Sequence, residues 1–200
     1  PDSRAGAITA MTAETAFPRV RRQMILRHAA GYVELGELLV DGEGPVPPSA
    51  RRLLERALDT LAELPAEARS HPDASLLEGE ALRALGEWER ALAPLTRAAE
   101  GATGRLEAWL GLGWCLKRLG RLDEAIHMLE RGRDASPRQA IVLYNLACYH
   151  SLAGDVPAAI ENLTQAIALD DRYRDLTGSE RDFDPIRADP RFQAATHVTV

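Results

Sequence analysis

The stretch GLGWCLKRLGRLDEAIHML, residues 111–129, holds two amphipathic segments that meet at Gly120. The apolar positions before and after that glycine each follow one face of a helix: Trp109, Leu112, Leu116 and Leu119, then Leu122, Ala125, Ile126 and Leu129. Glycine adopts positive φ at low cost, so Gly120 is the expected point at which the first helix stops and the chain reverses. The stretch therefore predicts a helix–turn–helix hairpin.

The same pattern recurs around Gly86 and Gly154, each 34 residues from Gly120. Three further columns keep this period: Ala91, Ala125 and Ala159; Leu95, Leu129 and Leu163; Ala98, Gly132 and Ala166. The small residues allow two helices to cross closely. One hairpin cannot bury its apolar face alone, but stacked hairpins share a continuous core. We therefore place three regular repeats at 72–105, 106–139 and 140–173.

These columns resemble the tetratricopeptide repeat (TPR) family. The third hairpin carries the pattern best, in Trp109, Leu112, Gly113, Gly120, Leu122, Ala125, Leu129, Gly132 and Pro137. The preceding hairpin departs from it, with Glu78 where leucine is usual and Thr103 where proline is usual. The resemblance implies an all-α fold, an α-α superhelix or solenoid of about four hairpins.

The two ends of the chain do not keep the period. Residues 20–71 are expected to form a divergent first hairpin, after an N-terminal tail at 1–19. Residues 174–200 are expected to form a C-terminal cap and tail. YNLACYHSLAG followed by DFDPIRADPRF resembles the end-of-group cap of bacterial TPR proteins. Phe183, Ile186 and Phe192 are expected to cover the apolar stripe of the last helix.

Composition limits the classes of partner. A net charge of -6 and a pI near 5.4 argue against a nucleic-acid partner. No apolar run reaches the roughly 20 residues that span a bilayer. Two cysteines are too few for a disulfide framework and favour a reducing compartment, so we expect a cytoplasmic protein. The resemblance of the end segment implies a bacterial protein. Because the chain starts at Pro1, a processed or truncated product is expected, with Met11 a candidate start.

Candidate catalytic groups are sparse. Cys148 and His150 resemble a nucleophile and base, but residues two apart on a helix point about 200° apart. The other histidines lack the spacing of metal ligands, and no glycine run cradles a phosphate. We therefore predict no enzyme activity, no cofactor and no metal site.

The resemblance implies that the first helix of each hairpin lines a concave groove. Its columns give the predicted partner-binding residues Leu76, Glu80, Arg83, Leu110, Trp114, Lys117, Arg118, Tyr144, Asn145 and Cys148, with Leu77, Gly111 and Ser151 beside them. Trp114 and Tyr144 are the expected apolar anchors, and Lys117 and Arg118 are expected to pair with carboxylates. The alternative is that Trp114 only packs between helices and that the two cations form a solvated helix end.

The predicted function is a non-catalytic protein–protein interaction module that binds a peptide or protein segment in this groove. Two alternatives remain open. GLGWCLKRLGRLDEAI is also similar to small three-repeat chaperones of type III secretion. The chain could also be a regulatory fragment of a larger enzyme.

Overall fold

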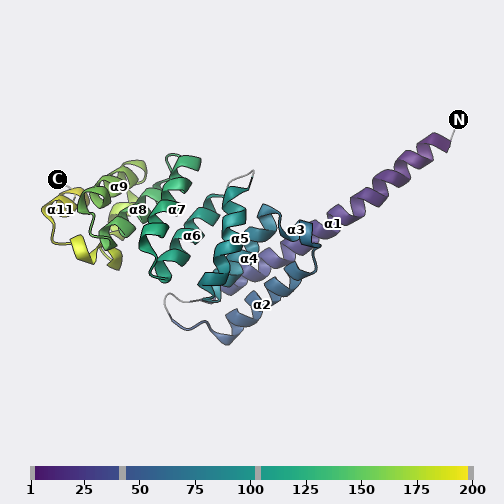
Figure 1. Ribbon diagram of the computed structural model, residues 1–200, viewed down its shortest axis with the longest axis horizontal. Helices are drawn as coiled ribbons and strands as arrows, with labels where there is room; N and C mark the ends of the chain where they lie inside the picture. The colour runs from purple at the N-terminus through teal and green to yellow at the C-terminus, as the bar shows by residue number, and fades with distance from the viewer. Residues whose placement is uncertain (1–2, 41–43, 102–104, 198–200) are drawn as a thin grey trace. The chain divides into compact units, whose positions relative to one another are not determined.

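The computed structural model describes residues 3–40, 44–101 and 105–197, with side chains from residue 18 onward. All elements in these ranges are helical, which confirms the predicted all-α class (Figure 1). They are α1 Ser3–Glu37, α2 Pro48–Ala62, α3 Ala66–Arg69, α4 Pro72–Ala84, α5 Trp88–Glu100, α6 Leu106–Arg118, α7 Leu122–Ala135, α8 Ala140–Leu152, α9 Val156–Leu169, α10 Arg172–Leu176, the 3-10 helix η1 Arg181–Ile186 and α11 Pro190–Thr196. The chain forms two compact units, Pro1–Gly101 and Ala102–Val200.

The first unit contains two hairpins, α1 with α2 and α4 with α5, and α4 packs against both α1 and α2. Its cores join Val33 with Leu54 and Ile25 with Leu61. The structure differs from the sequence prediction at the start, because α1 takes in most of the predicted tail at 1–19. Alanine is the strongest helix former, and the segment AGAITAMTAETA continues the helix upstream.

The three period-marking glycines close their hairpins in one way. Gly86, Gly120 and Gly154 have φ values of 78°, 74° and 78°, which confirms the predicted turn. After Gly120, the N–H of Arg121 donates to the carbonyl of Leu116 at 2.9 Å. The corresponding bonds follow the other two glycines, as in a Schellman motif. The 34-residue period is therefore also a period in backbone geometry.

Close helix crossings explain other small residues. A Cβ on Gly113 would lie 2.9 Å from the side chain of Leu129, and one on Gly79 would lie 2.5 Å from that of Leu95. In the divergent first hairpin, a Cβ on Gly36 would lie 2.7 Å from Leu54. The first hairpin thus keeps the helix contact of the regular repeats although its connection is longer.

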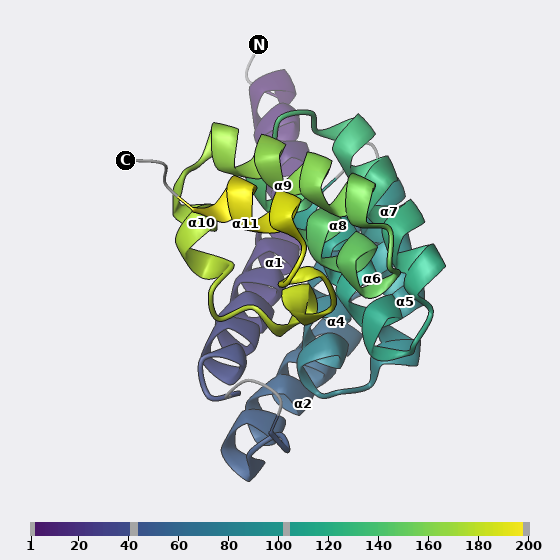
Figure 2. The same ribbon diagram turned by 90° about the vertical axis from the view of Figure 1, so that its left-hand side faces the viewer.

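The second unit stacks α6 and α7 against α8 and α9, followed by a C-terminal segment of three short helices. Figure 2 shows this segment across α8 and α9. Phe183, Ile186 and Phe192 are buried, as expected. However, η1 packs on α8, which is the first helix of the last hairpin, while α10 and α11 pack on α9. The segment therefore covers more than the last helix.

In the part of the chain that the structure describes, no helix is both long enough and apolar enough to cross a membrane.

Candidate functional site

The ten predicted partner-binding residues lie on the first helices of three hairpins. Leu76, Glu80 and Arg83 lie on α4 in the first unit; Leu110, Trp114, Lys117 and Arg118 lie on α6, and Tyr144, Asn145 and Cys148 lie on α8, all in the second unit. The second unit therefore contains both α6 and α8, whereas the α4 residues belong to the first unit.

On α4, the three residues serve mainly internal contacts. Leu76 is buried, and Glu80 is half-buried. The Arg83 guanidinium forms an ion pair with Glu37 at the end of α1. This pair links the two hairpins of the first unit.

On α8, the expected anchor Tyr144 is covered by the C-terminal segment. Its ring meets Tyr173 at 4.8 Å and the edge of Phe183 at 5.6 Å between centroids, which leaves 6% of the residue exposed. Burial raises the pKa of its phenol, and the nearby Cys148 raises it further. The expectation that Tyr144 offers an open apolar surface is therefore corrected: in this conformation it belongs to the core under the cap.

Cys148 and Asn145 also make contacts within the second unit. Cys148 is buried, and burial together with the negative charges of Glu180 and Asp182 raises the pKa of its thiol. A thiol held protonated at neutral pH is a weak nucleophile, which fits a packing role. Asn145 is half-buried, and its amide donates to the Ile141 carbonyl at 2.8 Å.

Lys117 connects three elements of the second unit. Its ammonium group forms an ion pair with Asp182 of η1 and lies 5.5 Å from the ring centroid of Tyr149 on α8. The side chains of Lys117 and Asp182 are only 27% and 15% exposed. The expected partner of this lysine, a carboxylate, is thus supplied by the chain itself.

Leu110, Trp114 and Arg118 are half-buried and repeat every four residues along α6. The Arg118 guanidinium lies 5.6 Å from the centroid of the Trp114 ring. A cation over an indole face is attracted to it, so the two side chains hold one another in place. We call these three residues the α6 strip. Together they form an apolar surface that ends in a positive charge.

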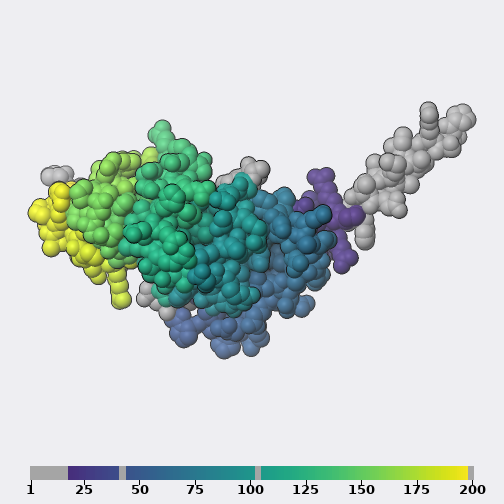
Figure 3. All heavy atoms as spheres, in the orientation of Figure 1, coloured from purple at the N-terminus to yellow at the C-terminus, as the bar shows by residue number. Residues whose placement is uncertain are grey.

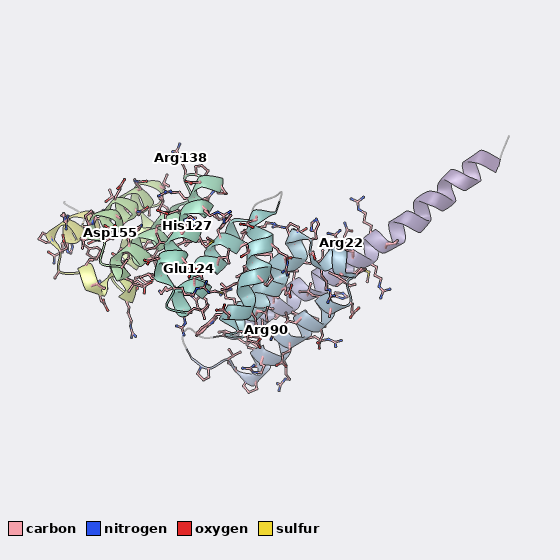
Figure 4. All side chains as sticks on the ribbon, in the orientation of Figure 1. Arg22, Arg90, Glu124, His127, Arg138 and Asp155 are labelled. Carbon is pink, nitrogen blue, oxygen red and sulfur yellow. The ribbon has the colours of Figure 1, made fainter. Side chains whose placement is uncertain are left out.

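Groups suited to catalysis do not gather in the part of the chain that the structure describes. Among the described residues, no three His, Cys, Asp or Glu side chains could hold a metal ion. His127 is exposed on α7, where Figure 4 shows it with Glu124. Both cysteines are buried thiols that form no disulfide with each other.

Sequence reasoning missed the residues that occupy the α8 surface, namely Asp182, Phe183 and Tyr173. Phe183 was expected against the last helix. No helical period runs through residues 170–189, so the sequence carries no signal for the surface on which they pack.

Comparison with known proteins supports the architecture. Residues 82–146 match the family model of the tetratricopeptide repeat. Comparison with curated proteins gives no match. The solved structure "MamA 41-end from Desulfovibrio magneticus RS-1" is 22% identical, with a TM-score of 0.58 over 84% of this chain and 89% of that one. "MamA MSR-1" is 20% identical, with a TM-score of 0.54 over 78% of this chain and 97% of that one.

A third solved structure, YrrB, is described as a TPR protein with an unusual peptide-binding site. It is 25% identical, with a TM-score of 0.52 over 66% of each chain. The family match covers the central hairpins, and the similar structures extend the likeness of fold beyond them. Residues 82–146 therefore carry the tetratricopeptide repeat, and the chain shares the all-α fold of these solved structures.

Proposed function

We propose that the chain is a non-catalytic interaction module that holds a segment of a protein partner on the α6 strip. The carrying observation is the chain's own C-terminal segment. It lies on the neighbouring first helix with an aromatic ring against Tyr144 and a carboxylate on Lys117. A partner segment that combines apolar and acidic side chains would use the same chemistry on α6, at Trp114 and Arg118.

Physical chemistry favours the α6 strip as the contact. An indole ring offers a large contact area for the loss of few rotamers, and the guanidinium can bind a carboxylate through two parallel hydrogen bonds. The Arg118–Trp114 stacking limits the motion of both groups before a partner arrives, which reduces the entropy lost on binding. YrrB, described as having a peptide-binding site, supports a peptide ligand.

This proposal uses fewer than the ten predicted partner-binding residues. Tyr144, Cys148 and Lys117 are engaged by the C-terminal segment, so they enter only if that segment moves. Asn145, Glu80, Arg83 and Leu76 remain predicted contacts. The absence of catalysis and of nucleic-acid or membrane partners, and a cytoplasmic location, remain part of the proposal. The secretion-chaperone and enzyme-fragment alternatives also remain predictions.

The test is a peptide-display selection with the wild-type chain, followed by fluorescence anisotropy with the selected peptides. We expect these peptides to carry apolar and acidic side chains. Trp114→Ala and Arg118→Glu should each weaken binding about tenfold or more, with unchanged helicity by circular dichroism.

Arg131→Glu is the matched control for Arg118→Glu. Arg131 is an exposed α7 arginine whose guanidinium lies 4.8 Å from the ring centroid of the buried Trp109. It repeats the cation–indole contact outside the α6 strip, so its charge reversal should leave binding unchanged. Selected peptides that bind both α6 variants as tightly as wild type would show that the site lies elsewhere.

A further inference from the structure

Helix α1 carries a second apolar face that no described residue covers. Its first apolar face, with Ile25, Ala29 and Val33, is buried in the first unit. The second face, which we call the α1 stripe, consists of Val20, Met24, His28, Gly31, Leu35 and Leu38. At 100° per residue the two faces lie roughly 140° apart around the helix.

The α1 stripe is strongly exposed along its length. Val20, Met24 and Leu35 are 52%, 53% and 54% exposed, and Leu38 is 81% exposed. A Cβ built on Gly31 would meet no atom within 4 Å. The turns of α1 that begin at residue 18, purple in Figure 3, lie at the surface. The stripe extends over about 22 Å of helix from Val20 to Leu35, with Leu38 just beyond the end of α1, and this is enough for a neighbouring helix to lie along it.

The charges beside the α1 stripe change sign along the helix. Arg21 and Arg27 flank its first half, and Glu34 flanks its second half. A second copy of this helix is complementary when it runs in the opposite direction, because basic then faces acidic at both ends. A parallel copy would place like charges together.

Arg27 and Glu34 give this complementarity a defined geometry. They are seven residues apart and therefore stand on the same flank of the α1 stripe. Both are exposed, and neither forms an ion pair with any residue that the structure describes. Residues on one flank of a two-stranded antiparallel helix pair face the same flank of the other helix. The arginine of each copy then meets the glutamate of the other.

We propose that two copies of this chain associate through antiparallel pairing of their α1 stripes about a twofold axis. In this register Leu35 packs beside Met24 of the second copy. His28 lies over Gly31 of the second copy, where the missing side chain leaves room for the imidazole ring. Arg27 pairs with Glu34 on both sides of the axis. The contact is isologous, so it closes as a dimer and does not extend into a fibre.

This inference is independent of the proposed function, because it concerns the first unit and needs no ligand on α6. The test is sedimentation equilibrium of the full chain from about 1 to 100 µM. Wild type should be dimeric, and Leu35→Asp should be monomeric with unchanged circular dichroism. Leu176→Asp is the matched control, since Leu176 is a 49% exposed leucine of the second unit, and it should leave the dimer intact.

Charge exchange tests the direction of pairing. Arg27→Glu or Glu34→Arg alone places like charges on both sides of the axis and should weaken association about tenfold. The double variant Arg27→Glu/Glu34→Arg restores two opposite-charge pairs and should return the dissociation constant to within about threefold of wild type.

Three results would overturn the proposal. The first is a wild-type chain that stays monomeric across this concentration range. The second is a double variant that associates no better than the single ones, since only antiparallel self-pairing predicts rescue. The third is a Leu35→Asp chain with lowered thermal stability and unchanged association, which would mean that a segment of the same chain covers the α1 stripe.

Discussion

At the scale of single residues, Glu78 is the clearest departure from the repeat. The same column holds Leu112 and Leu146, which are 2% and 0% exposed in the other two hairpins. Glu78 instead points its carboxylate to Arg97 at 3.0 Å and lines a small cleft between α2, α4 and α5. An exposed ion pair contributes little stability, so it does not replace the buried apolar contact that leucine makes in the other two hairpins.

We predict that Glu78→Leu stabilises the protein by about 1 kcal/mol, since the leucine would fill that cleft beside Leu58 and Leu82. Urea unfolding followed by circular dichroism measures the change. Glu55→Leu, at an exposed position of α2, should change stability by less than about 0.5 kcal/mol. Loss of stability in Glu78→Leu would mean that the ion pair with Arg97 outweighs the missing apolar contact.

At the scale of elements, the C-terminal segment is held by buried side chains and by a charge-dependent cap. Phe183 contacts the rings of Tyr144 and Phe192 and is fully buried. Asp189 begins α11, and its carboxylate accepts a hydrogen bond from the backbone N–H of Arg191 at 2.8 Å. The two features predict separate responses of the segment, one to truncation and one to acid.

Phe183→Ala should cost about 3–5 kcal/mol of stability in the second unit and loosen η1 from α8. The buried thiol of Cys148 reports this change, because its surroundings include Asp182 and Glu180 of the same segment. Alkylation followed by mass spectrometry should show faster labelling of Cys148 in the variant, with Cys115 little changed. Equal labelling of the two thiols would indicate global unfolding instead of release of the segment.

Acid should weaken the start of α11. The Arg191 side chain, with its backbone N–H, lowers the pKa of Asp189 to about 2, below the usual 3.8. Because the folded-state pKa is depressed, the stabilisation is present above about pH 4 and is lost as the pH falls through about 2. Backbone NMR shifts of residues 190–196 between pH 5 and pH 2 measure this loss. Asp189→Asn keeps an acceptor without the charge, so those shifts should change less with pH.

The elements also show which parts of the structure the sequence could predict. The hairpins follow from glycine and apolar columns that are local and periodic, and Gly120 turns the chain as its spacing predicts. Phe183 belongs to a segment without helical periodicity. The surface on which it packs is set by tertiary contacts, and no local sequence pattern predicts that surface. For this reason the openness of Tyr144 was predicted wrongly.

At the scale of the whole molecule, one contact type recurs throughout the array. The Gly36–Leu54 crossing of the divergent hairpin repeats those of Gly79 with Leu95 and Gly113 with Leu129. Repetition of this contact explains why sequence alone was sufficient for the fold class. It was less informative about surfaces, because the groove columns of a family do not show which of them the chain covers itself.

The position of the C-terminal segment also limits how such an array can grow. The next hairpin of a stack would pack its helices on α8 and α9, and η1, α10 and α11 already fill those places. A gene duplication that added a hairpin directly after α9 would have to displace Phe183, Ile186 and Phe192 into water. Longer homologues are therefore expected to have gained hairpins by internal insertion ahead of α8. The last hairpin, α8 with α9, and the C-terminal segment would then be inherited together.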